Sequence, residues 1–162
     1  MSHRPPGTVS EQRNDYRFST ELRVRLSETD AVGIVYFGSF SNYLDVGRMD
    51  YLSHLGLDQQ VGAHAVGTIA HLPPGAVAGL HLRFHRPARY KDNLIVHVRV
   101  AHIGRSSYTF HMWITDKRHP RTVATGELTL VWLDEAFVPA EIPAAFRSTV
   151  LAFEGEGSDA SR

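Results

Sequence analysis

The chain has no cysteine, and this absence excludes several kinds of chemistry. A protein without cysteine forms no disulfide, binds no zinc through thiolates and has no thiol nucleophile. No apolar run approaches the roughly 20 residues that a membrane-spanning helix needs. The N-terminal residues are polar and lack the apolar segment of a secretory signal. We therefore expect a protein of the reducing cytoplasm that has no membrane partner.

An excess of charge of one sign is also missing, because 17 Lys and Arg residues balance 17 Asp and Glu residues. A balanced chain has no overall attraction to nucleic acid, so we expect no such partner. Ten histidines are present, but no HExxH motif and no acidic partner at ligand spacing accompany them. The GxSxG elbow of serine hydrolases and a glycine-rich phosphate loop are absent too. The sequence predicts no metal site and no cofactor.

The feature that organises the chain is one long helix. Apolar positions recur every three or four residues, which predicts one buried helical face made of Phe37, Phe40, Leu44, Gly47, Tyr51 and Leu55. Gly47 is a poor helix former, and we interpret it as a place where another backbone packs close. Gly56 is suited to end the helix as the C′ glycine. Residues 30–33 (DAVG) are typical of a turn, so Asp30 is expected near the unpaired N–H groups of the helix start.

One segment before the helix and most of the chain after it alternate apolar and polar residues, the period of a β-strand. This pattern predicts strands over 18–26, 66–71, 77–86, 92–102, 107–116 and 123–134. Short turns join the later strands, which favours an antiparallel sheet. The helix is about 27 Å long, so only a sheet that curls around it can bury it. A short helix is expected over 144–153.

Five short sequence blocks carry a family resemblance. Residues 28–37 (ETDAVGIVYF), followed by DVGR at 45–48, resemble the hotdog-fold acyl-CoA thioesterases of the 4-hydroxybenzoyl-CoA thioesterase-like branch. Residues 84–94 (FHRPARYKDNL), 103–107 (IGRSS) and 126–131 (GELTLV) extend the likeness. It implies an α+β hotdog fold, in which a curved antiparallel sheet of five to six strands wraps a long central helix. The domain then covers residues 16–153, between a disordered leader (1–15) and a disordered tail (154–162).

The resemblance also implies an activity, the hydrolysis of an acyl- or aroyl-CoA thioester to the free acid and CoA. Asp30 matches the family's catalytic aspartate, which acts as nucleophile or as general base for water. Phe37 matches the position whose backbone N–H polarises the thioester carbonyl. Arg48 is the third catalytic candidate, for which a structural or substrate-orienting role is favoured. From the residues alone, Asp30 is also compatible with a helix cap or turn, and Gly33 with an ordinary turn glycine.

Further candidates concern the substrate. The residues expected to bind its acyl part lie at or near the helix start: Gly33, Val35, Tyr36, Phe40 and Tyr43. The aromatic members either line an aryl slot or belong to the core, which is the commoner fate. Four basic residues near turns are candidates for the phosphates of CoA, because guanidinium groups match phosphate oxygens: Arg86, Arg89, Lys91 and Arg105. The alternative for these four is a solvated loop.

Three other functions stay open at this stage. The first is a thioesterase that releases an acyl or polyketide chain from an acyl carrier protein. The second is a hotdog hydratase, although no histidine lies near Asp30 in the sequence. The third is a non-catalytic acyl-CoA-binding protein. By the family likeness we expect a homo-oligomer, at least a dimer and further a homotetramer, with the site at the subunit boundary.

Overall fold

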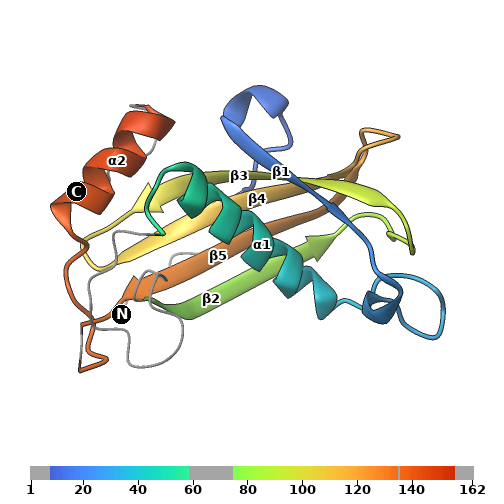
Figure 1. The fold of residues 1–162 in the computed structure, drawn as a ribbon, viewed down its shortest axis with the longest axis horizontal. Helices are drawn as coiled ribbons and strands as arrows, with labels where there is room; N and C mark the ends of the chain where they lie inside the picture. The colour runs from blue at the N-terminus through green and yellow to red at the C-terminus, as the bar shows by residue number, and fades with distance from the viewer. Residues whose placement is uncertain (1–7, 59–74, 135, 156–162) are drawn as a thin grey trace.

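A computed structural model describes residues 8–58, 75–134 and 136–155 of the chain. Within these residues a single antiparallel sheet packs one face against a long helix, α1 (Ser39–His54), as Figure 1 shows. The strands in spatial order are β1 (Phe18–Arg23), β3 (Asn93–Ile103), β4 (Ser107–Asp116), β5 (Thr122–Trp132) and β2 (Gly75–Phe84). Shorter helices complete the described chain: η1 (Arg13–Asp15), η2 (Leu26–Glu28) and α2 (Ala144–Glu154). This α+β arrangement is the predicted hotdog fold, with five strands; the strand expected over 66–71 lies outside the described residues.

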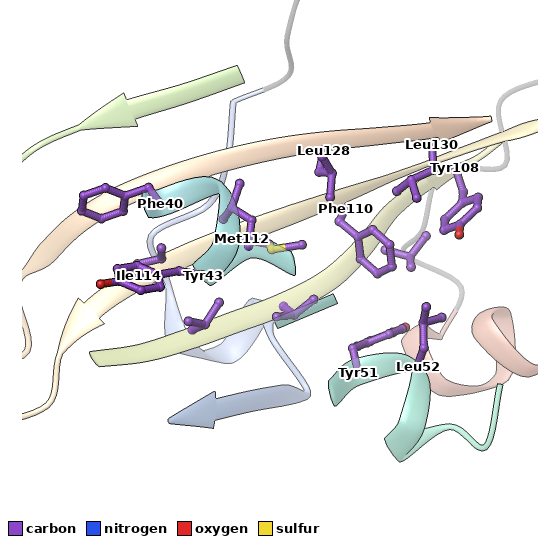
Figure 2. Close-up of a cluster of buried hydrophobic side chains, with 14 of the residues drawn as sticks. Phe40, Tyr43, Tyr51, Leu52, Tyr108, Phe110, Met112, Ile114, Leu128 and Leu130 are labelled. Carbon is purple, nitrogen blue, oxygen red and sulfur yellow. The ribbon is translucent and has the colours of Figure 1, made fainter. Parts of the chain in front are cut away.

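The core lies between α1 and the inner face of the sheet (Figure 2). The alternation of β3 and β4 sends every second side chain inward, and these residues are fully buried: Leu94, Val96, Val98, Val100, Phe110, Met112 and Ile114. The helix contributes Phe40, Leu44, Tyr51 and Leu52. Burying side chains of this size contributes about 1.5–3 kcal/mol each, so this layer contributes strongly to the stability of the fold.

Gly47 is a position at which α1 packs tightly against the sheet. A Cβ atom at this position would lie 2.8 Å from Cγ1 of Val96 and 3.1 Å from Cγ2 of Val98. The sequence suggested that a second backbone packs close to Gly47. The close neighbours are instead the methyl groups of two valines of β3. The missing side chain explains why a poor helix former sits in the middle of the helix.

The two ends of α1 differ from each other in how well the sequence located them. Gly56 has φ +67°, and the N–H groups of Gly56 and Leu57 donate to the carbonyls of Ser53 and Leu52, a Schellman motif. This confirms the predicted C′ glycine. At the other end the helix begins at Ser39, so Phe37 precedes it and is 64% exposed instead of facing the core. The prediction that Phe37 belongs to the buried helical face is therefore wrong, because the helix begins two residues later.

The outer face of the sheet is partly covered by the chain before β1. Glu11, in the segment that the sequence assigns to the leader, accepts a hydrogen bond from the Thr122 hydroxyl of β5. The ring of Tyr16 is buried against His97 and Trp113. At the other terminus Glu154, assigned to the tail, is the last residue of α2. Among the described helices none has the length and apolar character to cross a membrane.

Candidate active site

Asp30 lies in a tight loop that its own side chain holds together. Its Oδ1 accepts hydrogen bonds from the N–H groups of Val32 (2.8 Å) and Ile34 (3.3 Å). The backbone closes the same loop, because the Asp30 N–H donates to Ile34 O and the Gly33 N–H to Asp30 O. Gly33 has φ +81°, which a side chain would disfavour. The carboxylate is half-buried, and its Oδ2 accepts no hydrogen bond from the described residues, so this oxygen is available for chemistry.

The Asp30 loop is attached to the start of α1. Glu28 O accepts hydrogen bonds from the Tyr36 N–H (2.9 Å) and from the Ser39 hydroxyl (3.1 Å). Immediately after Tyr36, the N–H groups of Phe37 and Gly38 find no acceptor among the described residues. Unpaired N–H groups at a helix start attract negative charge, such as a developing oxyanion. The structure thus brings a carboxylate-bearing loop and a pair of free donors together through Glu28.

The loop between β2 and β3 packs beside the Asp30 loop. Ile34 pairs with Arg89 in an antiparallel bridge, and the Val35 N–H donates to Ala88 O. Three of the four predicted phosphate-binding residues belong to this loop and are exposed there: Arg86, Arg89 and Lys91. The fourth, Arg105, lies in the β3–β4 turn, where it approaches Glu141 at 4.0 Å. The 11 residues of β3, at about 3.3 Å each, place this turn roughly 35 Å from the others. The structure does not bring Arg105 together with them.

Arg48 also lies away from Asp30. It follows Ser39 by nine residues, which is about 13 Å along the helix axis. Its side chain is 14% exposed, and Nη2 lies 2.5 Å from Oδ1 of Asp45. Burial raises the pKa of Tyr108 to about 12, and the nearby Arg48 charge opposes this shift. Arg48 therefore belongs to the half of the molecule around the start of β4, whereas Asp30 adjoins the start of β3.

The predicted substrate-binding aromatic residues separate into two groups. Tyr36 and the neighbouring Phe37 are exposed, with ring centroids 4.5 Å apart. Phe40 and Tyr43 are instead buried in the core (Figure 2), where Phe40 makes an edge contact with exposed Phe84 of β2. Val35 and Gly33 differ in the same way, since Val35 is buried and Gly33 is exposed. Tyr36 and Phe37 thus form an exposed apolar pair beside the free donors, and Phe84 is exposed where it contacts Phe40.

The sequence did not identify Glu28 as a functional residue. Its carboxylate Oε2 accepts hydrogen bonds from the Tyr43 hydroxyl and from the Arg25 N–H, both at 2.8 Å. Burial raises the pKa of Tyr43 above its usual value, and the hydrogen bond to Glu28 adds to the rise. Tyr43 is the feature of the sequence that could have indicated this contact, because a hydroxyl on the buried face of a helix needs a polar partner.

Metal ligation finds no support in the described part of the chain, where no three His, Asp or Glu side chains form a group able to hold an ion. His111 illustrates the arrangement that occurs instead. Its Nε2 lies 3.2 Å from Oε2 of Glu127 on the neighbouring strand, which is a pair and not a set of ligands.

Comparison with known proteins agrees with this fold. The chain is 26% identical over 133 residues to the chloroplastic acyl-acyl carrier protein thioesterase ATL3 of Arabidopsis thaliana, covering 82% of this chain and 67% of that one. It thus spans about two thirds of the length of that plant protein. A thioesterase from Thermus thermophilus, solved with coenzyme A and zinc, superposes with a TM-score of 0.73 at 27% identity and covers 88% of this chain and 97% of its own.

A second solved structure supports the fold alone. The 1,4-dihydroxy-2-naphthoyl-CoA thioesterase of Synechocystis superposes with a TM-score of 0.70 at 21% identity, covering 85% of this chain and 98% of its own. The family model of the thioesterase-like superfamily matches residues 24–150, which include the Asp30 loop, α1 and all but the first strand. The chain therefore belongs to the thioesterase-like superfamily.

Proposed function

We propose that this thioesterase hydrolyses an acyl- or aroyl-CoA thioester to the free acid and CoA, with Asp30 as the reacting carboxylate. One observation carries the proposal: the Asp30 loop is bound through Glu28 to the turn where the Phe37 and Gly38 N–H groups are free among the described residues. A carboxylate and two donors on adjoining segments are what attack on a thioester requires. Neither a cofactor nor a metal takes part in the proposed reaction.

The proposed chemistry assigns one task to each group. The free N–H groups accept the negative charge that develops on the carbonyl oxygen. Asp30 either removes a proton from the attacking water or attacks the carbonyl carbon itself to give a mixed anhydride, which water then cleaves. In both routes the C–S bond breaks, the thiolate of CoA leaves and takes up a proton, and one water is consumed. The hydrogen bonds from Val32 and Ile34 hold Oδ1, which leaves Oδ2 to react.

The position of the β2–β3 loop supports CoA as the thiol carrier. Arg86, Arg89 and Lys91 are exposed on a segment that pairs with the Asp30 loop. Phosphate groups at one end of a substrate whose thioester lies near Asp30 would meet these cations. Replacing Arg89 by Ala should raise KM for an acyl-CoA by about tenfold, a size typical of one charge-assisted contact. The matched control is Arg105→Ala, which should leave KM unchanged because that residue lies at the other end of β3.

The exposed edge of β2 supports a second copy of the chain as partner. This strand ends the sheet and exposes Val77, Leu80 and Phe84, although apolar edge strands are normally covered. We propose that two copies pair along this edge to form a dimer, which places Phe84, the neighbour of Phe40 near the start of α1, at the subunit boundary. We further propose that these dimers associate into tetramers and that the protein acts in the cytoplasm. Light scattering would measure the mass in solution, and a monomer would contradict the paired edge.

An acyl carrier protein is the second candidate for the thiol carrier. The relative from Arabidopsis thaliana supports it, and the basic β2–β3 loop suits an acidic surface as well as it suits phosphates.

A thiol-release assay decides between the two carriers. It compares aryl, short-chain and long-chain acyl groups, each presented on CoA and on a carrier protein. We expect faster release from CoA; faster release from the carrier protein would favour the second candidate, and no release from either would contradict both. A single turnover in ¹⁸O water then separates the two routes, because only the anhydride route places the label in the Asp30 carboxylate.

A further inference from the structure

Glu28 connects the two halves of the candidate site through three bonds. Its backbone carbonyl accepts from the Tyr36 N–H and the Ser39 hydroxyl, and its carboxylate accepts from the Tyr43 hydroxyl. All three donors come from the start of α1 or the turn before it. Asp30 lies two residues after Glu28, and the free N–H of Phe37 lies one residue after Tyr36. The position of Glu28 therefore fixes how far the carboxylate lies from the donors.

Tyr43 is the group that keeps Glu28 in place. Its ring is 2% exposed and packs against Phe40, so the hydroxyl has a fixed direction. The Glu28 side chain is itself only 13% exposed, and its Oε2 lies 2.8 Å from that hydroxyl. A hydrogen bond from a buried hydroxyl to a largely shielded carboxylate resists competition from water, whereas the ion pair of Glu28 with exposed Arg25 is weak. A tyrosine hydroxyl is protonated across the physiological range even at its ordinary pKa, and burial moves the pKa of Tyr43 still higher, so this hydroxyl is a donor.

We propose that Glu28 and Tyr43 form a positioning pair, which holds the Asp30 loop at the correct distance from the free N–H groups at the start of α1. The inference rests on the proposed thioesterase function, since it assigns the pair a role in that reaction. Neither residue touches the reacting atoms in this scheme. A loop displaced by about 1 Å can reduce a reaction rate by as much as 10²-fold, so a single hydrogen bond at this point has a large effect on turnover.

The same helix carries a matched control. Tyr51 lies two turns after Tyr43, is fully buried, and donates its hydroxyl to Oε1 of Glu154 at 2.6 Å. Figure 2 shows both tyrosines in the core cluster. Each hydroxyl thus bonds to a glutamate outside its helix, but Glu154 belongs to α2 and not to the Asp30 loop. Loss of either hydroxyl should cost similar stability, and only the loss at Tyr43 should disturb the site.

The experiment compares Tyr43→Phe with Tyr51→Phe. We expect Tyr43→Phe to lower kcat about tenfold with KM within twofold, while Tyr51→Phe leaves both within twofold and lowers Tm by a similar amount. Glu28→Gln should keep most of the activity, because an amide oxygen still accepts from Tyr43, and Glu28→Ala should lose it. In an Asp30→Asn background Tyr43→Phe should have no further effect, as expected for a residue that acts through Asp30. Equal kcat values for the two tyrosine variants would overturn the proposal.

A second measurement does not depend on activity. Hydrogen exchange of the Val32, Ile34 and Tyr36 amides reports whether the loop remains attached. We expect faster exchange at these amides in Tyr43→Phe and unchanged exchange in Tyr51→Phe. Unchanged exchange in both variants would overturn the positioning role even if the wild-type protein hydrolyses thioesters. Conversely, a wild-type protein with no thioesterase activity but faster exchange in Tyr43→Phe would contradict the proposed function and leave the link between pair and loop established.

Discussion

Two loops of this protein have the same hydrogen-bonding pattern, and only one of them lies at the candidate site. The side chain of Asp134 accepts hydrogen bonds from the N–H groups of Ala136 and Val138, both at 2.9 Å, as Asp30 does two and four residues further along its own loop. In each loop the aspartate N–H donates to the carbonyl four residues later. Each loop is also closed by an antiparallel bridge, Thr29 to Val35 and Leu133 to Pro139.

The two loops differ in what surrounds them. The Asp30 loop is bonded through Glu28 to the start of α1 and pairs with the β2–β3 loop. The Asp134 loop follows β5 and is exposed, and within the described residues it makes no backbone hydrogen bond to the start of a helix. An aspartate that accepts amide hydrogen bonds is thus a general way of closing a loop. The neighbouring free donors, and not the loop itself, are what make Asp30 a candidate for catalysis.

The largest expected effect is therefore on activity, and only at one loop. Asparagine keeps an oxygen that can accept the two amide hydrogen bonds but removes the charge, so neither loop should change shape. Asp30→Asn should lower kcat by about 10²–10⁴, the loss typical of a positioned base or nucleophile. Asp134→Asn should leave kcat within twofold. Steady-state thiol release measures both variants, and retained activity in Asp30→Asn would remove this residue from the mechanism.

A smaller effect on stability should be common to both loops. Asp30→Ala and Asp134→Ala each remove the acceptor of two backbone N–H groups, a loss of about 1 kcal/mol by analogy with helix caps. We expect the two variants to lower the free energy of unfolding by similar amounts in urea titrations. If Asp30→Ala instead stabilised the protein, the loop would be strained in favour of function and the two loops would not be equivalent.

The alternating and helical patterns predicted the fold well because burial of one face depends on residues close in sequence. The strands β3 and β4, most of the predicted face of α1 and the glycine that ends the helix were predicted and are found. The pattern failed at Phe37, because helical spacing alone does not reveal that the helix begins two residues later, at Ser39. Apolar residues in the preceding turn continue the same spacing without belonging to the helix.

The candidate site was harder to predict because its parts are distant in sequence. Arg89 pairs with Ile34, which lies on the other side of α1 in the chain, and no local pattern indicates that pairing. The same limitation grouped Arg105 with the β2–β3 loop, although a whole strand separates them. The role that we propose for Glu28 depends on its hydrogen bond from the buried hydroxyl of Tyr43, which no local pattern indicates. The family resemblance identified Asp30 as a candidate, and the residues around it became known only from the structure.

The smallest expected effects come from substituting the residue with positive φ in each of the two loops. Gly33 has φ +81° and Phe137 has φ +60°, at equivalent positions. A Cβ at Gly33 would meet no atom within 4 Å, so Gly33→Ala changes only the backbone preference and should cost about 1 kcal/mol. Phe137 is 80% exposed, so Phe137→Gly loses little packing and should stabilise the protein by roughly 0.5 kcal/mol, since relief of strain exceeds the entropy of glycine.

These two substitutions should also differ in their effect on activity, as the two aspartate substitutions do. Gly33→Ala should lower kcat/KM severalfold, because the altered loop carries the Asp30 carboxylate, whereas Phe137→Gly should leave it unchanged. Urea titration and thiol release on the same preparations measure both quantities. Equal activity in the two variants, together with the expected opposite changes in stability, would mean that the Asp30 loop tolerates displacement. The reaction would then depend less on the geometry of this loop than its bonds to α1 imply.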